Sequence, residues 1–512
     1  MRKYTDLEYL KLPKLRRFGY RVGSFFTGIP KAIWNFIKSI GSGLKKAGIA
    51  VGSECKDIWE TFVKGDWKTK LSFLVMGFGN LARGQILRGI LFLLFEIVFI
   101  GYMIIAGGYW LSMLPSLGKQ GPVEVYNPVL DVNGTTYHDH SFKILLYGVL
   151  TIFFIIAFIY TWRVNIRQNK IAEEILRSGK KLKSGKDDLR SMVDDNFHRT
   201  LLALPLTGIL IFTVMPIVFM VLIAFTNYSA ANNGYSNNLF HWVGLDSFNK
   251  LFSFGDAGGG MSYAATFGEI LAWTLIWAFF ATFTNYFLGI LVAMMINKKG
   301  IKLKKVWRTV LVLTIAIPQF ISLLYVSKLF AKNGYVNLML FNNLGLFTKS
   351  MPFWDDATWA KVTVILVNIW IGIPYLMLMA TGILMNIPQD LYESARIDGA
   401  SAWQQYRKIT LPYMLFVTGP YLLTSFIGNM NNFNVIFLLT GGGPTNGAAS
   451  GETAVGHTDL LITWLFKITT SGEKADYAFA SVIGIVVFVI VALISLIVYR
   501  LMPSVKNEED FQ

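Results

Sequence analysis

Long apolar runs, separated by polar and often lysine-rich segments, dominate the hydrophobic pattern of this chain. A run of about 18 or more apolar residues is long enough to cross the hydrocarbon core of a bilayer as a helix. Pro318, Gly372 and Pro374 fall inside such runs and should break or bend the helices that contain them. The pattern predicts an all-α membrane protein with eight spans, near residues 86–106, 143–162, 201–225, 269–296, 310–330, 362–385, 413–439 and 477–501.

The distribution of basic residues predicts the sidedness of these spans, because loops that remain in the cytosol carry an excess of lysine and arginine. Segments 163–199 and 298–308 are dense in these residues, whereas segments 107–142 and 226–267 contain few of them. We therefore expect both termini to be cytosolic. The polar connection after the sixth span, residues 388–412, should also face the cytosol.

That connection has the pattern of two short helices joined by a glycine turn. Pro388 is suited to open the first helix, since the N–H that it lacks would have no partner there, and Gly399 should end it. Ser401 and Gln404 have the spacing of a capping box, so a second helix should begin there and stop before Pro412. Small residues at the bend would let another protein approach the backbone closely: Ser394, Ala395, Gly399 and Ala400.

The connection contains Glu393-Ser394-Ala395, then Asp398-Gly399-Ala400, and ends in Ile409-Thr410-Leu411-Pro412. These residues resemble the EAA loop of binding-protein-dependent ABC importer permeases, although Ser394 replaces the alanine of that pattern. The resemblance implies that residues 391–398 form the coupling helix, which rests in a groove of a cytosolic ATPase. Glu393 would form an ion pair with a basic residue of the ATPase. The coupling residues that the resemblance implies are Glu393, Ser394, Ala395, Asp398, Gly399 and Ala400.

The sixth and seventh spans read Asn368–Tyr375 and Ser425–Phe433, and Leu439–Pro444 follows them. With Gly456–Leu461, they resemble the MalF-type subunit of maltose and maltodextrin importers over roughly residues 200–505. The resemblance implies a type I ABC importer permease fold in a bacterial cytoplasmic membrane. It also implies a second, MalG-like permease subunit, an ATPase homodimer and an extracytoplasmic sugar-binding protein. ATP hydrolysis would then belong to the ATPase, so we expect no enzymatic activity and no cofactor in this chain.

The spacing of polar residues in the seventh span gives a separate reason to expect a sugar path. Ser425, Asn429 and Asn432 lie at i, i+4 and i+7 and would share one helix face. Polar side chains at bilayer depth need partners, and the hydroxyls of an oligosaccharide both donate and accept hydrogen bonds. Gly372 would admit a sugar ring closely, and Tyr375 would offer it an aromatic face.

The substrate-binding residues that the matched motifs imply are Ile371, Gly372, Tyr375, Ser425, Gly428, Asn429 and Asn432. Relatives have an aromatic residue in some cases at the position of Gly428, so this glycine leaves the preferred chain length open. An alternative is that Asn429 and Asn432 only join helices through hydrogen bonds, which is a common use of polar residues in membranes. Galacto-oligosaccharides or other glycosides are alternative substrates.

Composition narrows the remaining function classes. The 512 residues are 54% hydrophobic and carry a formal charge of +16, but the basic residues cluster beside apolar runs, so we expect lipid contact and no nucleic acid. The single cysteine, Cys55, excludes an intramolecular disulfide framework, and the scattered histidines indicate no metal site. The Gly-rich segment 179–186 has the wrong glycine spacing for a phosphate-binding loop.

Four regions follow from these patterns: residues 1–84, 85–199, 200–505 and 506–512. The first is basic and either forms helices on the membrane surface or remains a flexible cytosolic tail. The second contains two spans and a basic loop, the third is the permease core with the loop at 388–412, and the fourth is a cytosolic tail.

Glu96 lies in the first span, where it either couples transport to protons or is a carboxyl group buried against other helices. A proton-coupled secondary transporter is therefore a rival function. A membrane enzyme of polysaccharide synthesis is a second rival, but the paired carboxylates that it needs are not found in the sequence.

Overall fold

The computed structural model describes residues 48–501 apart from a few short segments, and isolated residues before them. The omitted segments are 122, 128–131, 137–138, 183–184, 233–238, 255–261, 299, 341–343, 345–348 and 447–454, and the residues described before 48 are 13, 38, 41–43, 45 and 46. Most of the basic N-terminal region before residue 38, and the tail at 506–512, therefore lie outside the described residues. Two compact units divide the chain: Met1–Met220 with Asn233–His241, and Val221–Asn232 with Trp242–Gln512.

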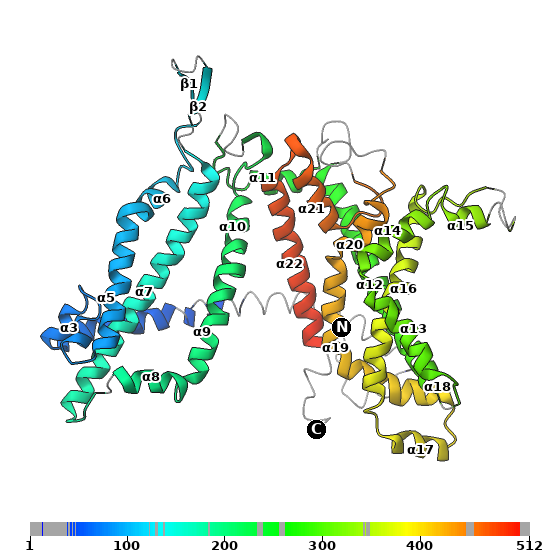
Figure 1. Ribbon diagram of the computed structural model, residues 1–512, viewed down its shortest axis with the longest axis horizontal. Coiled ribbons are helices and arrows are strands. Elements are labelled where there is room, and N and C mark those ends of the chain that lie inside the picture. The colour runs from blue at the N-terminus through cyan, green and yellow to red at the C-terminus, as the bar shows by residue number, and fades with distance from the viewer. Residues whose placement is uncertain are drawn as a thin grey trace. The chain divides into compact units, whose positions relative to one another are not determined.

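The first unit consists of helices and one β-hairpin (Figure 1). Residues 48–64 are helical. The elements that follow are α3 (Trp67–Leu71), α4 (Phe78–Leu81), α5 (Ile86–Tyr102), the π-helical turn η1 (Met103–Gly107), α6 (Gly108–Met113), β1 (Val123–Asn127), β2 (Val132–Thr136), α7 (Ser141–Arg177), α8 (Gly185–Val193), α9 (Phe197–Ile209) and the π-helical turn η2 (Leu210–Val214). The two strands pair antiparallel, with Val125 opposite Gly134.

The two long helices of this unit, α5 and α7, pack through aromatic side chains. Phe99 stacks on Phe158 with ring centroids 3.9 Å apart, and Phe95 meets Phe154 edge to face at 5.9 Å. Helix α10 (Met215–Ile223) continues the chain from the first unit into the second.

The second unit is helical throughout its described residues, apart from isolated bridges. Its elements are η3 (Ala230–Asn232), α11 (Asp246–Leu251), α12 (Tyr263–Asn297), α13 (Lys304–Ala316), α14 (Gln319–Leu329), α15 (Tyr335–Leu338), α16 (Ala357–Leu384), α17 (Gln389–Ile397), α18 (Ala402–Gln405), the π-helical turn η5 (Tyr406–Thr410), α19 (Leu411–Met430), α20 (Phe433–Thr440), α21 (Leu461–Thr470), η7 (Gly472–Lys474) and α22 (Tyr477–Leu501).

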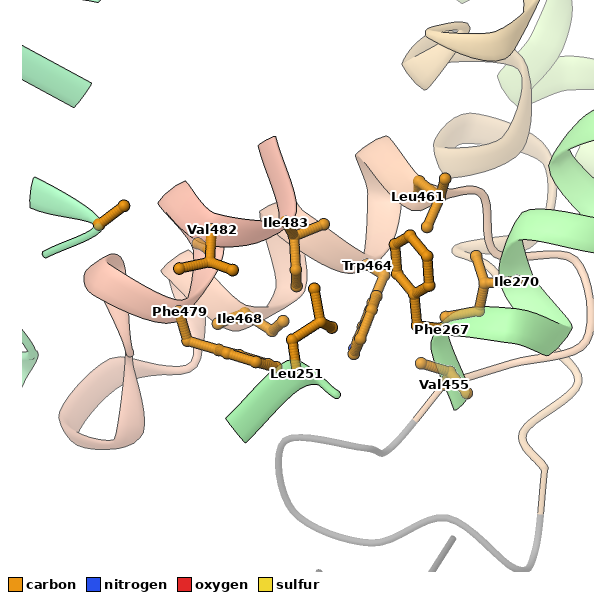
Figure 2. Packing of buried hydrophobic residues seen from close by; sticks show 12 residues of the cluster. Leu251, Phe267, Ile270, Val455, Leu461, Trp464, Ile468, Phe479, Val482 and Ile483 are labelled. Atoms are coloured by element: carbon orange, nitrogen blue, oxygen red, sulfur yellow. The ribbon is translucent and has the colours of Figure 1, made fainter. Parts of the chain in front are cut away.

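Helices α12 and α16 form the centre of this unit and pack closely because small residues separate them. A Cβ atom added to Gly289 would lie only 2.6 Å from the Cβ of Leu376. Figure 2 shows a second part of the core, where side chains of α11, α12, α21 and α22 meet around the fully buried Trp464 and Phe479. Burial of these aromatic side chains fixes the α21–α22 hairpin against α12.

The prediction of an all-α membrane protein is confirmed apart from the short β1–β2 hairpin. Seven helices in the described part of the chain are long and apolar enough to cross a membrane, and an eighth span results if the bent pair α13 and α14 is counted as one. These two helices meet at 92° around Ile317 and Pro318, as the proline predicts. By contrast, α16 continues through Gly372 and Pro374, so no break occurs at these residues.

Candidate functional site

The connection between the sixth and seventh predicted spans folds as a helix, a turn and a second helix. Pro388 occupies the N-cap of α17, where its missing N–H leaves no helical hydrogen bond unmade. The helix ends in a Schellman motif, in which the N–H of Ala400 donates to the carbonyl of Ala395 at 2.8 Å and that of Gly399 to Arg396 at 3.0 Å. Gly399 has φ +75°, a conformation that favours glycine.

The predicted capping box is present at the start of α18. The Ser401 hydroxyl accepts from the N–H of Gln404, and the Gln404 side chain accepts from the N–H of Ser401 at 2.7 Å. The prediction that this helix stops before Pro412 is wrong. The π-helical turn η5 connects α18 to α19 without a break, and Pro412 lies in the first turn of α19, where its missing N–H is tolerated.

Large apolar side chains on this connection are exposed, with no cover from the part of the chain that the structure describes. Ile397 is 87% exposed and Trp403 is 66% exposed, and Leu391 is also exposed. The base of the connection is fixed, because the buried Ile387 precedes α17 and the hydroxyl groups of Tyr392 and Thr410 are 2.9 Å apart. The result is an anchored surface with an exposed apolar edge. Figure 1 shows the two short helices of this surface, α17 and α18.

The other coupling residues lie on the same surface. Glu393, Ser394 and Asp398 are exposed, and Ala395 and Ala400 are half-buried at the turn. Sequence and structure therefore agree on where these residues lie. Their role in contacting an ATPase stays a prediction.

The polar residues of the seventh span do not share one helix face, so that part of the prediction is wrong. Helix α19 ends at Met430, and Asn432 is the N-cap of α20, where its side chain accepts from the N–H of Val435. The amide Nδ2 of Asn432 lies 3.4 Å from Oδ1 of Asn429, so the turn still brings these two side chains together. The sequence Asn429-Met430-Asn431-Asn432 contains a signal of this turn, since asparagine is a favoured N-cap residue, but the prediction placed these residues on one continuous helix.

Asn429 also joins α19 to α12. Its Nδ2 atom donates to the hydroxyl of Thr282 at 3.0 Å, and the indole N–H of Trp277 donates to its carbonyl at 3.0 Å. These bonds correspond to the alternative of hydrogen bonding between helices. Sugar contact by Asn429 stays a prediction.

The space in front of Gly372 is occupied by another helix. A Cβ atom on this glycine would lie 2.5 Å from Nδ2 of Asn285 on α12, so the glycine admits the Asn285 amide and no sugar ring in this conformation. Ile371 is half-buried against the apolar cluster around Trp273 and Trp277. Both residues therefore lie at the α12–α16 packing surface.

Tyr375, Ser425 and Gly428 remain accessible. Tyr375 is 53% exposed, and its ring centroid lies 6.4 Å from that of Tyr421 on α19. Ser425 is half-buried one turn after Tyr421, and a Cβ atom on Gly428 would meet nothing within 4 Å. Tyr421 and Thr282 belong to this region but are missing from the sequence prediction, because neither lies in a quoted motif.

Two buried amide atoms near Gly372 have no hydrogen-bond partner among the described residues: Oδ1 of Asn285 and Nδ2 of Asn368. Both side chains belong to residues that are only 6% exposed. An unpaired buried polar atom costs about 1–3 kcal/mol. These two amide atoms would therefore be stabilised by a hydrogen-bond partner that the described helices do not supply. Asn285 precedes all of the quoted motifs and was not predicted.

Glu96 of the first unit is buried, and its Oε2 atom accepts from the backbone N–H of Met76 at 2.8 Å. This contact agrees with the interpretation of a carboxyl group buried against other parts of the chain. Within the described residues, no group of three or more histidine, cysteine, aspartate or glutamate side chains is placed to hold a metal ion.

Comparisons with known proteins identify the family of this chain. The family described as binding-protein-dependent transport system inner membrane component matches residues 285–507, from within α12 to beyond α22. The maltodextrin transport system permease protein MalC of Streptococcus pneumoniae serotype 4 is 32% identical over 453 residues, which cover 86% of this chain and 97% of that protein. The chain belongs to this family of transport components.

Two further relatives of the permease come from Bacillus subtilis. The maltodextrin transport system permease protein MdxF is 32% identical over 455 residues, covering 88% of this chain and 98% of that protein. The galactooligosaccharides transport system permease protein GanP is 32% identical over 439 residues, covering 85% and 97%. Family membership makes the permease a multi-pass membrane component of a transport system and not an enzyme.

Proposed function

We propose that the permease imports oligosaccharides of the maltodextrin class across a bacterial cytoplasmic membrane, driven by ATP hydrolysis in a separate protein. The relatives named for maltodextrin transport support the substrate class. The basic segments that flank the spans support a cytosolic location for both termini and for α17. A second, MalG-like permease subunit, an ATPase homodimer and an extracytoplasmic sugar-binding protein complete the proposed transporter.

The observation that carries the proposal is the anchored, uncovered surface of α17 and α18. A soluble loop would bury its large apolar side chains or lack them, whereas Leu391, Ile397 and Trp403 are exposed on a connection held at both ends. Such an apolar edge, with the carboxylate of Glu393 beside it, fits a groove on a partner protein that supplies a basic residue.

Alternating access is the proposed mechanism. Closure of the ATPase dimer on ATP displaces α17, and the continuous helix from α18 through η5 to α19 carries this displacement into the spans. The spans then reorient and open the sugar path toward the binding protein. The permease itself forms no covalent bond with the sugar or with ATP.

The sugar path is proposed to run beside α12, α16, α19 and α20. Tyr375 and Tyr421 offer aromatic faces to the apolar side of a sugar ring, and Ser425, Asn429 and Asn432 offer hydrogen bonds. Gly428 leaves open space beside them. After a shift of α16 along α12, the unpaired amide atoms of Asn285 and Asn368 would be available to sugar hydroxyls.

The proposal is tested by reconstituting the permease with its transporter partners in liposomes and measuring ATP-dependent uptake of maltotriose. Glu393→Ala is expected to weaken ATPase docking by about 2–5 kcal/mol, since it removes one partner of an interfacial ion pair. Uptake should fall by more than tenfold as a consequence. Glu473→Ala is the matched control, because Glu473 is an equally exposed glutamate on η7, outside the α17 surface.

Unchanged uptake by Glu393→Ala would refute the coupling proposal. Uptake that persists without ATP and requires a proton gradient would instead support a secondary transporter. A preference for galacto-oligosaccharides over maltotriose would move the substrate to the class named for the relative GanP.

A further inference from the structure

The segment that precedes α5 has an arrangement of polar and apolar side chains opposite to that of a soluble domain. Its polar side chains point inward: Thr69, Ser72 and Asn80 are completely buried. Two of its large apolar side chains are exposed, Leu74 at 76% and Trp67 at 63%, whereas Met76 is completely buried. In water this arrangement would expose apolar surface and bury polar groups, both at a cost in free energy.

The N–H groups of the non-helical backbone between α3 and α4 are all hydrogen-bonded. Every backbone N–H from Ser72 to Gly79 has a partner within the chain. Two of these partners are side chains of the long helices, because Met76 donates to Oε2 of Glu96 on α5 and Gly77 donates to Oδ1 of Asn165 on α7, at 2.8 and 2.9 Å. Irregular backbone at membrane depth is tolerated only when protein groups satisfy it in this way.

Carbonyl groups of the same turn are bonded from α7. The indole N–H of Trp162 donates to the carbonyl of Phe73 at 3.0 Å, and Nδ2 of Asn165 donates to the carbonyl of Ser72 at 2.9 Å. The turn also approaches α5 closely, since a Cβ atom on Gly77 would lie 2.2 Å from the carbonyl oxygen of Gly89. Two helices thus hold the turn through polar contacts and leave its apolar side chains Leu74 and Val75 exposed.

An internal ion pair holds the base of the segment. The Arg83 side chain is 1% exposed and donates to the carboxylate of Asp66 at 2.6 Å, to the hydroxyl of Thr69 at 2.6 Å and to the amide of Asn169 at 2.8 Å. Glu173 accepts from Thr69 at 2.8 Å and completes the network. The residues that open and close the segment are therefore joined, so the chain enters and leaves on the same side.

The depth of the turn follows from its contact with α5. Arg88 hydrogen-bonds Gln168 and lies level with the charged end of α7, whereas Glu96 lies eight residues further along α5. Although Glu96 bonds Met76, the next residue, Gly77, lies against the carbonyl of Gly89 and donates to Asn165. Gly89 is one residue past Arg88 and Asn165 is three from Gln168, so at 1.5 Å per residue Gly77 lies about 1.5–4.5 Å past the level of the Arg88–Gln168 pair. Figure 1 shows α3 beside the same ends of α5 and α7.

We propose that residues 66–85 form a re-entrant element, which inserts into the leaflet at the charged end of α7 and contacts acyl chains through Trp67, Leu74 and Val75. Acyl chains are the occupant that fits, because this surface continues the exposed apolar side chains of α5, including Ile90 and Leu94. The inference is independent of the transported sugar and of the ATPase contact.

The test places a nitroxide label at residue 74 of the full chain in Cys55→Ser background, with the transporter assembled in lipid nanodiscs. Leu74→Cys is compared with two control positions. Leu94→Cys replaces another exposed leucine, on α5, and Lys64→Cys replaces a lysine whose side chain is 73% exposed. Frequent collisions of the nitroxide with oxygen indicate contact with lipid, and frequent collisions with a water-soluble nickel chelate indicate exposure to water.

The oxygen-to-nickel ratio at residue 74 is expected to match that at residue 94 and to exceed that at residue 64 several-fold. A ratio equal to that at residue 64 would place the turn in water, and protection from both reagents would show that another protein covers it. Either result would overturn the proposal.

A second measurement tests the anchor at Glu96 with the same label. Glu96→Leu removes the acceptor for the N–H of Met76, so the ratio at residue 74 should fall several-fold as the turn leaves the membrane. Glu96→Gln is the matched control, since its amide oxygen still accepts this bond and the ratio should stay unchanged. Equal oxygen-to-nickel ratios in the two variants would refute the anchoring role of Glu96. If Glu96→Leu does not assemble, the ratio at residue 74 in the chain with Glu96 still shows whether the turn is inserted.

Discussion

Substitutions at Gly399 test whether the proposed docking surface needs glycine for its backbone conformation or for its small size. A Cβ atom at this position would meet nothing within 4 Å, so the chain itself sets no steric limit. The cost arises from φ +75°, since an L-residue other than glycine is strained in this region by about 1–2 kcal/mol. This cost corresponds to about a 5–30-fold loss of the closed Schellman turn relative to open forms.

Three substitutions at Gly399 rank this effect. Asparagine adopts the left-handed region more readily than alanine although it is larger, and valine is strongly disfavoured there. We therefore expect ATP-dependent uptake in the order glycine, asparagine, alanine, valine. The assay is uptake in reconstituted liposomes, with hydrogen exchange at Ala400 as the readout of its bond to Ala395. Lower uptake with asparagine than with alanine would refute the conformational argument and indicate that the partner requires a bare backbone.

Three further substitutions test packing and charge. Gly372→Ala should lower the free energy of unfolding by about 1–3 kcal/mol, because the added Cβ would overlap an amide of α12. The control is Gly382→Ala on the same helix, whose Cβ meets nothing within 4 Å and should leave stability unchanged. The unfolding temperatures of the two variants are compared. Lys467→Met leaves the fully buried carboxylate of Asp459 without its cation, 2.6 Å away in the native pair, and should lower the free energy of unfolding by about 3–5 kcal/mol in the same assay. Burial alone would raise the pKa of Asp66, but hydrogen bonds from a threonine and an arginine hold the pKa below 3.8. The stability that this group contributes is therefore present above pH 3.8 and is lost as the pH falls through the lowered pKa. In a series of unfolding temperatures measured at different pH, Asp66→Asn should reduce this loss of stability at acid pH.

The sequence predicted the elements whose boundaries have chemical markers. Pro388, Gly399 and Ser401 each carry a backbone or side-chain property that ends or begins a helix, and the structure has these boundaries at or within one residue of the predicted positions. The bend at Pro318 was predictable for the same reason. Hydropathy alone was enough to place the spans, since their lengths are set by the bilayer.

Prediction failed where packing between segments decides the structure. The break between α19 and α20 was not predicted, because the prediction from hydropathy placed residues 413–439 in one span, although Asn432 is of a residue type that favours the N-cap at which it lies. Gly372 has the appearance of a ligand-facing residue, but its free side is occupied by Asn285, which lies 87 residues earlier in the chain. No local pattern records such a contact.

The error at Pro412 strengthens the proposed mechanism. A second helix that stopped before this proline would leave a joint between the docking surface and the membrane, and a displacement of α17 would be lost there. Instead α18, η5 and α19 run without interruption from Ala402 to Met430, a length of about 43 Å at 1.5 Å per residue. The far end of this rod carries Asn429, which bonds α12 through Thr282 and meets Asn432 at the turn into α20. In the proposed mechanism, a displacement applied near Ser401 is therefore carried along this helix to the residues proposed to contact the sugar, without a separate relay between the two sites.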